Sequence, residues 1–461
     1  MKRLFCLSLL SVCATAFALP QASDVKISRN RAGDAFKIQY RLSASAVVTV
    51  DVRVGDVSVG ETALTNATGD VNALMGAGRH AVRWPVPAGW SARDADVKAV
   101  VTAWATNCPP AYMVINLTNA NERIAYYTST NAFPAPLSDE RWRTEYLVLR
   151  KIPAAGVVWR MGPNPYEPID TSMENCKASR LVMLTEDFYL GIYEMTRRQN
   201  NAAQGWTDCA SYGSARETSG FQTQWAQWAD EMANVKDIPV GRQSYYSLRG
   251  GRDLPAEQTW PASGRKVFGG SLLTMRNRLK VDLDLPTDVQ WEFACRAGTS
   301  GQNYLNVDTR ESSARLGEIA WYGANSSNAT YQACFPQPVG LKAPNAFGLY
   351  DMLGNSGEWC VNWAPKTPSP DFSATLEIDP VGPAECEVNK QAADADQGPN
   401  YRAWRGGNFG SAAACVRSGA SYGNGQSWGD GRRLNTDPGG SSETYRYGNG
   451  YRVWAPAMAV R

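Results

Sequence analysis

The stretch Leu285–Thr299, LPTDVQWEFACRAGT, determines how the centre of this 461-residue chain folds. Thr287 and Gln290 stand three residues apart, the spacing at which two side chains cap each other's backbone N–H groups at the start of a helix. Trp291 and Phe293 follow at once. The pattern therefore predicts a capped helix that begins after Thr287 and carries large aromatic side chains into a core.

The chain beyond this helix is rich in Gly, Asn, Ser and aromatic residues. A core there must come from Trp and Tyr side chains packed between irregular loops, which disulfides or a metal ion would fix. The chain before it shows short strands instead: Phe36, Ile38 and Tyr40 alternate with polar residues, the period-two pattern of a half-buried strand. We expect a small all-β, immunoglobulin-like sandwich over residues 20–106, a connecting segment with strands over 107–150, and a second domain over 151–461.

The second domain carries further blocks that stand in a fixed order. After LPTDVQWEFACRAGT come Asn345–Trp359 (NAFGLYDMLGNSGEW), Arg405–Phe409 (RGGNF) and Gly450–Trp454 (GYRVW). In this order and spacing the blocks resemble the formylglycine-generating enzyme, or sulfatase-modifying factor, family. The resemblance implies a loop-rich α+β domain with a C-type-lectin-like fold.

The first residues predict export. A basic start, an apolar run from Leu4 to Ala14 and the small-residue pattern Ala16-Phe17-Ala18 are typical of a cleaved signal peptide over residues 1–18. A lipoprotein leader using Cys13 is the alternative. No later stretch has the long uncharged run of a membrane-spanning helix. We expect a secreted, periplasmic or cell-surface protein.

The cysteine and charge counts narrow the function classes. Ten cysteines, less Cys6 and Cys13 of the leader, leave eight, an even number that suits disulfides in an oxidising compartment. The one histidine, His80, excludes metal sites built on two or more histidines within the chain. With 46 basic and 44 acidic residues, the chain has no excess charge for nucleic-acid binding.

The resemblance also places two catalytic positions. Members that oxidise a sulfatase cysteine to formylglycine use a cysteine pair that holds copper, because thiolates are soft ligands suited to Cu(I). The corresponding positions here are Ser411 and Val416, and neither supplies a thiolate. Cys415 stands one residue from the second position. It would be the catalytic cysteine only if the protein is an oxidase after all. The resemblance otherwise suggests a disulfide between Cys415 and Cys295.

The block around Asp351 is the candidate metal site. Calcium prefers several oxygen ligands on a tight loop, with carboxylates and backbone carbonyls mixed. Carried over from the family, the ligands are the carboxylates of Asp351 and Glu358 and the carbonyls of Gly354 and Ser356. The alternative is that the two carboxylates only bind loop amides. We also expect buried arginines to pair with Glu292 or Glu358.

Two functions of different classes remain open. In the first, the protein is an exported, non-catalytic member that binds a glycan, peptide or protein, with the loop Ser421–Trp428 (SYGNGQSW) as a recognition surface. In the second, it is a copper-dependent oxidase acting on an exported sulfatase through Cys415. The missing first cysteine favours the binding function.

Overall fold

A computed structural model describes residues 19–119, 124–163, 179–206, 235, 237–241, 243, 245–251, 260–306, 313–328, 333–363, 373–383, 402–422 and 449–460. The chain divides into two compact units, residues 1–106 and 107–461. The expected signal peptide, most of the proposed recognition loop, and the cysteines at 176, 209 and 386 lie outside the described residues.

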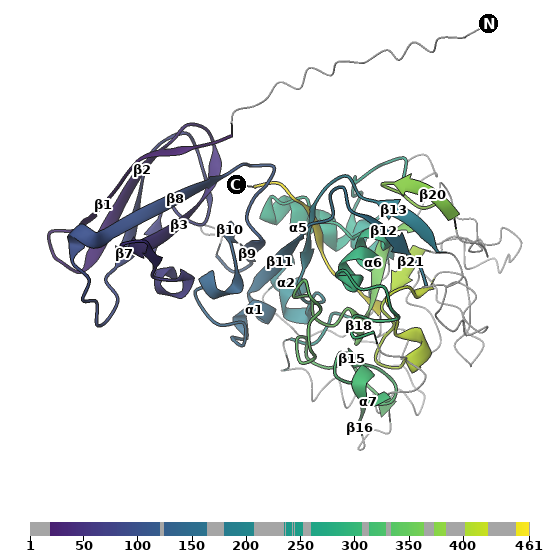
Figure 1. Ribbon diagram of the computed structural model, residues 1–461. Helices are drawn as coiled ribbons and strands as arrows, with labels where there is room; N and C mark the ends of the chain where they lie inside the picture. Colours follow the sequence, from purple (N-terminus) through teal and green to yellow (C-terminus); the bar gives the residue numbers. More distant parts are fainter. Residues whose placement is uncertain are drawn as a thin grey trace, which may run out of the picture. The chain divides into compact units, whose positions relative to one another are not determined.

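The first unit consists of two antiparallel sheets, drawn in purple and blue in Figure 1. One sheet has the order β1-β2-β7-β5, and in the other β3 pairs with β4, β6 and β8. The strand bounds are β1 Ala22–Arg29, β2 Ala35–Leu42, β3 Ala46–Val54, β4 Val57–Ser58, β5 Thr68–Gly69, β6 Leu74–Met75, β7 Gly78–Pro85 and β8 Val97–Trp104, with single 3₁₀ turns at Glu61–Leu64 and Asp94–Asp96.

Alternating burial along β2 explains how these sheets share a core. Phe36, Ile38 and Tyr40 are buried while the residues between them are exposed, as the period-two pattern predicts. They meet Trp84 of the same sheet and Val48 of the other in one hydrophobic cluster. The single histidine takes part in this packing, since the His80 ring stacks on Tyr40 with the ring centroids 5.3 Å apart.

The second unit is built on a five-stranded sheet with the order β10-β9-β11-β14-β24. The segment 107–150, expected to be a connection with strands, supplies three of these strands. The strand β24, near the C-terminus, pairs with β14 and forms one edge of the sheet. The bounds are β9 Tyr112–Asn116, β10 Ile124–Tyr127, β11 Tyr146–Ile152, β14 Phe188–Gly191 and β24 Trp454–Pro456.

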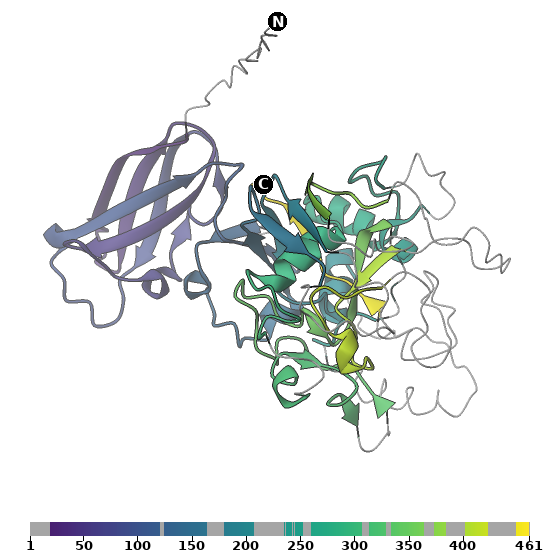
Figure 2. The ribbon, with the colours of Figure 1, turned by 45° about the vertical axis from the view of Figure 1, so that its right-hand side comes forward.

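Smaller sheets surround this one, as the two views of the ribbon show (Figures 1 and 2). Their orders are β12-β13-β20 and β22-β21-β19-β23, with the pairs β15-β18 and β16-β17. The bounds are β12 Val158–Met161, β13 Arg180–Met183, β15 Ala320–Trp321, β16 Ser327–Asn328, β17 Ala333–Cys334, β18 Leu353–Gly354, β19 Gly357–Trp363, β20 Ser373–Ile378, β21 Arg402–Arg405, β22 Ser421–Tyr422 and β23 Asn449–Gly450.

The helices of the second unit are short. They are α1 Arg141–Thr144, α2 Arg197–Gln204, α4 Tyr245–Arg249, α5 Gly270–Leu279, α6 Asp288–Arg296 and α7 Ser313–Leu316, and single 3₁₀ turns lie at Thr130–Ala132 and Ala413–Cys415. None of the helices in the described part of the chain has the length and apolar character needed to cross a membrane. The unit is thus a mixed α/β domain in which sheets and loops predominate.

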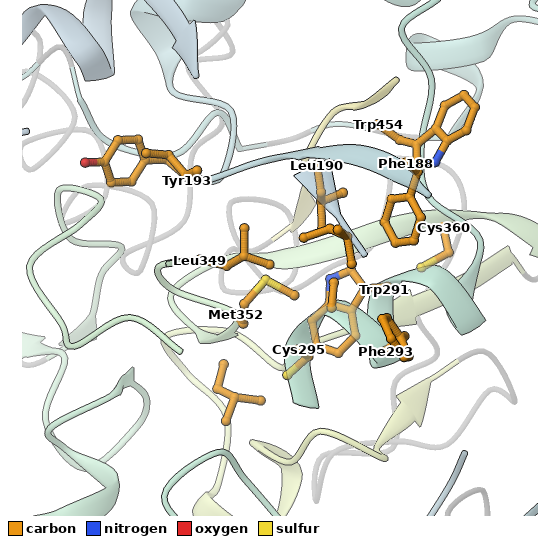
Figure 3. Close-up of a cluster of buried hydrophobic side chains, with 14 of the residues drawn as sticks. Phe188, Leu190, Tyr193, Trp291, Phe293, Cys295, Leu349, Met352, Cys360 and Trp454 are labelled. Carbon is orange, nitrogen blue, oxygen red and sulfur yellow. The ribbon is translucent and has the colours of Figure 1, made fainter. Parts of the chain in front are cut away.

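Helix α6 is the helix that the sequence predicts. Thr287 accepts a hydrogen bond from the backbone N–H of Gln290, and the Gln290 side chain binds the Thr287 N–H in return. The helix then buries Trp291 and Phe293 in the main core, which Figure 3 shows together with Met352. The capping box therefore fixes where the helix begins and which side chains reach the core.

Replacing Thr287 by alanine should lower the free energy of unfolding by about 1 kcal/mol, because the backbone N–H of Gln290 at the start of α6 loses the hydroxyl that accepts its hydrogen bond. Thr287→Ser keeps a capping hydroxyl and should stay within a few tenths of a kcal/mol of the parent chain. Urea unfolding followed by tryptophan fluorescence measures both. Equal stability of the alanine and serine variants would show that the cap does not hold this helix.

Candidate functional site

The site is organised by two buried ion-pair networks, the first of which joins helix α6 to strand β21. Arg405 reaches Glu292 through Nη1, 3.0 Å from Oε2, and Asp288 through Nη2, 3.2 Å from Oδ2. Glu292 also accepts hydrogen bonds from Arg296, one helical turn on, and from the backbone of Gly162. All four charged side chains are buried, so each needs the others as partners.

The second network joins strand β19 to the C-terminal block. Glu358 pairs with Arg452, whose Nη2 lies 2.8 Å from Oε1, and its Oε2 accepts the indole N–H of Trp291 at 2.7 Å. Arg452 also donates to the carbonyls of Gly191 and Tyr350. The predicted pairing of buried arginines with Glu292 and Glu358 is confirmed in both networks.

The loop between these networks has an unusual backbone. Asp351, Gly354 and Asn355 all have φ between 50° and 80°, a region that favours glycine. A Cβ at Gly354 would lie 2.1 Å from the carbonyl oxygen of Trp321, and one at Gly357 would lie 1.6 Å from the Trp404 ring. Glycine is required at both positions because neighbouring atoms already fill the space.

Glu194 holds this loop in place, and the sequence analysis missed it. Its Oε1 accepts the backbone N–H of Ser356 and its Oε2 accepts the Asn355 side chain, both at 2.8 Å. Glu194 lies just after β14, about 160 positions earlier in the chain. The only local signal is a charged residue in the apolar stretch GIYEM, and that signal does not name its partner.

Negative charge exceeds positive charge around the loop. Glu194, Asp351 and Glu358 are all buried, and Arg452 is the arginine that neutralises this group. Burial raises the pKa of Glu194 well above its usual range, and the nearby carboxylates of Asp351 and Glu358 raise it further. Burial likewise raises the pKa of Asp351 to about 6. The site thus favours either a bound proton or an added cation.

The residues partly fit the calcium ion that the family resemblance implies. Asp351 Oδ2 accepts the N–H of Gly340 at 2.6 Å, whereas the buried Oδ1 has no hydrogen-bond partner. Both oxygens of Glu358, however, already serve Arg452 and Trp291. Among the residues that the structure describes, no group of three or more His, Cys, Asp or Glu side chains is placed to hold a metal ion. A cation here would depend on Asp351 and on backbone carbonyls, with Glu358 shared.

Ser411 and Val416, the positions that the resemblance assigns to a cysteine pair, make structural contacts. Ser411 is buried, and its hydroxyl accepts the Asn408 N–H at 2.7 Å and lies 3.1 Å from Asn408 Oδ1, which closes a turn. Val416 is fully buried in the main hydrophobic cluster. Cys415, between them, is also buried. Neither of the two positions offers a soft metal ligand.

The disulfide suggested between Cys295 and Cys415 is not formed in the structure. Cys295 carries a free thiol at the end of α6 and donates a hydrogen bond to the Ser418 hydroxyl at 3.5 Å. It lies deep in the core, as Figure 3 shows, and burial raises its pKa to about 12. Cys108, by contrast, is a free and exposed cysteine. The bridge stays a prediction for the oxidised protein.

The burial of Cys295 gives a test that separates the free thiol from the predicted disulfide. With a pKa near 12, roughly one thiol in ten thousand is ionised at pH 8, and thiolate is the reactive form. We expect iodoacetamide to label Cys108 within minutes in the native protein and Cys295 only after denaturation without reductant. Mass spectrometry of the labelled peptides reads both sites. If Cys295 stays unlabelled until reductant is added, it is bridged and the free-thiol geometry is wrong.

Known proteins of one family are similar to this chain. The family profile described as the sulfatase-modifying factor enzyme 1-like domain matches residues 154–430. The chain is 28% identical over 202 residues to the chaperone protein LppX of Paenibacillus barcinonensis, and this match covers 40% of the chain and 65% of LppX. It is 33% identical over 101 residues to the formylglycine-generating enzyme of Thermomonospora curvata, which covers 22% of the chain and 33% of that enzyme.

Two solved structures are also similar. Treponema denticola variable protein 1 has a TM-score of 0.41 at 20% identity and covers 68% of this chain and 95% of its own. PvdO from Pseudomonas aeruginosa has a TM-score of 0.40 at 18% identity and covers 67% of this chain and 94% of its own. The chain spans less than two thirds of the length of the curated relatives named above. Since the matching family profile covers more than half of the sequence, the chain belongs to the sulfatase-modifying factor family.

Proposed function

We propose that this chain is an exported member of the family that binds a polypeptide and does not oxidise it. The observation that carries the proposal is the pair of positions Ser411 and Val416. The first hydroxyl closes a turn with Asn408 and the second side chain belongs to the core, so each residue has a structural role in place of a copper ligand. An active oxidase would need two thiolates there.

The kind of ligand is supported by a relative. A chaperone acts on polypeptides, and the protein named chaperone LppX matches 40% of this chain. Among glycan, peptide and protein, we therefore place a polypeptide first. Export in this proposal depends on the leader pattern of residues 1–18. The proposal also keeps the immunoglobulin-like description of the first unit and the C-type-lectin-like description of the second.

The second candidate is a copper-dependent oxidase that converts a sulfatase cysteine to formylglycine through Cys415. It is favoured by the formylglycine-generating enzymes among the relatives. Two of these enzymes are 32–33% identical to this chain over about a hundred residues. Two features argue against this candidate: Cys415 is buried, and the residue next to it is Val416. A reactive thiolate needs access to its substrate.

A direct assay separates the two candidates. A peptide with the sulfatase motif Cys-x-Pro-x-Arg, incubated with the protein, Cu(I) and oxygen, should yield no formylglycine above a protein-free control. The protein should suppress aggregation of an unfolded exported client, and Cys415→Ser should suppress it equally if it folds. Turnover of the peptide by the parent chain, lost in a folded Cys415→Ser variant, would establish the oxidase and refute our proposal.

We further propose that calcium occupies the loop of Asp351, with the carbonyls of Gly354 and Ser356 and a shared Glu358 as the other ligands. Two features support it: the partnerless buried Oδ1 of Asp351 and the excess of carboxylates over arginine in this region. The ion would have a structural role, because it would neutralise buried charge and fix the strained loop.

Calcium at 100 times its Kd should stabilise the protein by about 2.7 kcal/mol, and EDTA should remove that gain. The melting temperature should therefore rise by several degrees with calcium, as differential scanning fluorimetry at pH 7 would show. Asp351→Asn should abolish most of the response. Asp282→Asn, at an exposed aspartate, is the matched control and should leave the response to calcium intact. A melting temperature that ignores both calcium and EDTA would rule the site out.

A further inference from the structure

A small pocket lies between helix α4, the segment 260–268 and strand β21, apart from the site described above. Its walls are aromatic and basic, and it is lined by Tyr245, Tyr246, Arg249, Trp260, Phe268 and Arg402, with Ser263, Gly250 and Gly251 completing it. The pocket is partly open, and the space inside it is about 10 Å³, enough for one atom of water size. It is therefore too small for a sugar ring or an aromatic side chain, but it can admit the tip of a charged group.

Among the residues that the structure describes, positive charge exceeds negative charge in the region of the pocket. Three arginines share the carboxylate of Asp284, which is fully buried: the nearest N–O distances are 2.7 Å for Arg249, 3.4 Å for Arg265 and 3.6 Å for Arg276. The Nη2 of Arg276 has no hydrogen-bond partner. Asp282 also acts on Arg276, but it is exposed. Buried charges are normally paired, so this arrangement favours an additional anion.

Two guanidinium groups reach the pocket itself. Arg249 forms a two-pronged ion pair with Asp284 and also donates to the Tyr245 hydroxyl at 2.8 Å. Arg402 is buried and packs its guanidinium on the rings of Tyr245 and Trp363, 4.4 and 3.1 Å from their centroids. The guanidinium of Arg402 is thus held by its faces, and its Nη1 also donates to the Val361 carbonyl at 3.2 Å, so its position at the pocket is fixed.

A polar atom in the wall has no partner within the described structure. The Ser263 hydroxyl oxygen is buried and makes no hydrogen bond, although Ser263 lines the pocket. A buried hydroxyl without a partner is unfavourable, so such atoms usually face a ligand or a water molecule. Helix α4 and the glycines after it keep the wall close, since a Cβ at Gly250 would lie 2.6 Å from the Gly269 nitrogen.

We propose that this pocket binds one oxygen of an anionic group, a carboxylate or a sulfate, between Arg249, Arg402 and the Ser263 hydroxyl. Guanidinium groups bind carboxylate and sulfate-type oxygens strongly, and aromatic walls exclude water and strengthen the attraction. The anion would come either as a free ion or as the carboxylate of a bound polypeptide. This inference does not depend on the proposed function, because it rests on a different set of residues.

Isothermal titration at low ionic strength tests the proposal with sodium sulfate, and with sodium chloride at matched ionic strength as the comparison. Sulfate should bind saturably with a Kd of about 1 mM or tighter. Ser263→Ala should weaken binding about tenfold, because it removes a hydrogen bond to a charged group. Ser138→Ala, at an exposed serine outside the pocket, is the matched control and should change nothing. Arg402→Lys keeps the charge but loses the planar fork, and should weaken binding as well.

A second arm distinguishes the two sources of the anion. A short peptide with a free C-terminal carboxylate is compared with the same peptide amidated. Binding of the free acid alone, weakened by Ser263→Ala, would assign the pocket to a polypeptide carboxylate. Saturable sulfate binding without peptide binding would assign it to a free ion. If neither probe binds saturably, or if binding is the same in the parent chain, Ser263→Ala and Arg402→Lys, the pocket is not an anion site.

Discussion

The second unit depends on the carboxylate of Glu292, which one turn of helix α6 places in the centre of the domain. Glu292 binds Arg405 from β21, Arg296 from its own helix and the backbone of Gly162. Segments more than 100 residues apart therefore meet at one buried group. The adjacent Trp291 extends the same helix to the second network, because its indole N–H binds Glu358. A domain with few helices and many loops is organised in this way around one short helix, the nine-residue α6.

Such networks favour a unique arrangement more than they favour stability. Bringing charges out of water costs several kcal/mol per ion, which good pairing offsets only in part. Removing one partner, in contrast, leaves an unpaired buried charge and typically costs 3–5 kcal/mol. Each ion pair therefore selects against any loop arrangement in which its partner is displaced. Close packing against glycines adds to this selection, since Gly406 brings the backbone within reach of the Trp291 ring.

Local patterns in the sequence predicted the local structure well. The capping box at Thr287 identified α6, and period-two alternation identified strand β2, because these signals depend on neighbours a few residues apart. Glu194 escaped prediction because its partners at Asn355 and Ser356 are about 160 positions away. The arginine cluster around Asp284 was missed because Arg249, Arg265 and Arg276 come from separate segments before that carboxylate, which no pattern over a few residues connects. The pairing of Glu292 and Glu358 with arginines was anticipated only through the family resemblance, because a family pattern relates residues that are far apart in the sequence.

The buried networks also explain how a member of this family can keep its fold while changing its chemistry. The Arg405 and Arg452 networks contain no cysteine, and Ser411 meets the demands of its turn with a hydroxyl and a neighbouring asparagine. Oxidation of a substrate cysteine, by contrast, requires two accessible thiolates. These thiolates take no part in the ion pairs. The residues that hold the scaffold and the residues that would carry out catalysis are thus separate sets. In the function that we propose, Ser411 and Val416 replace the thiolate pair while the ion pairs keep the scaffold.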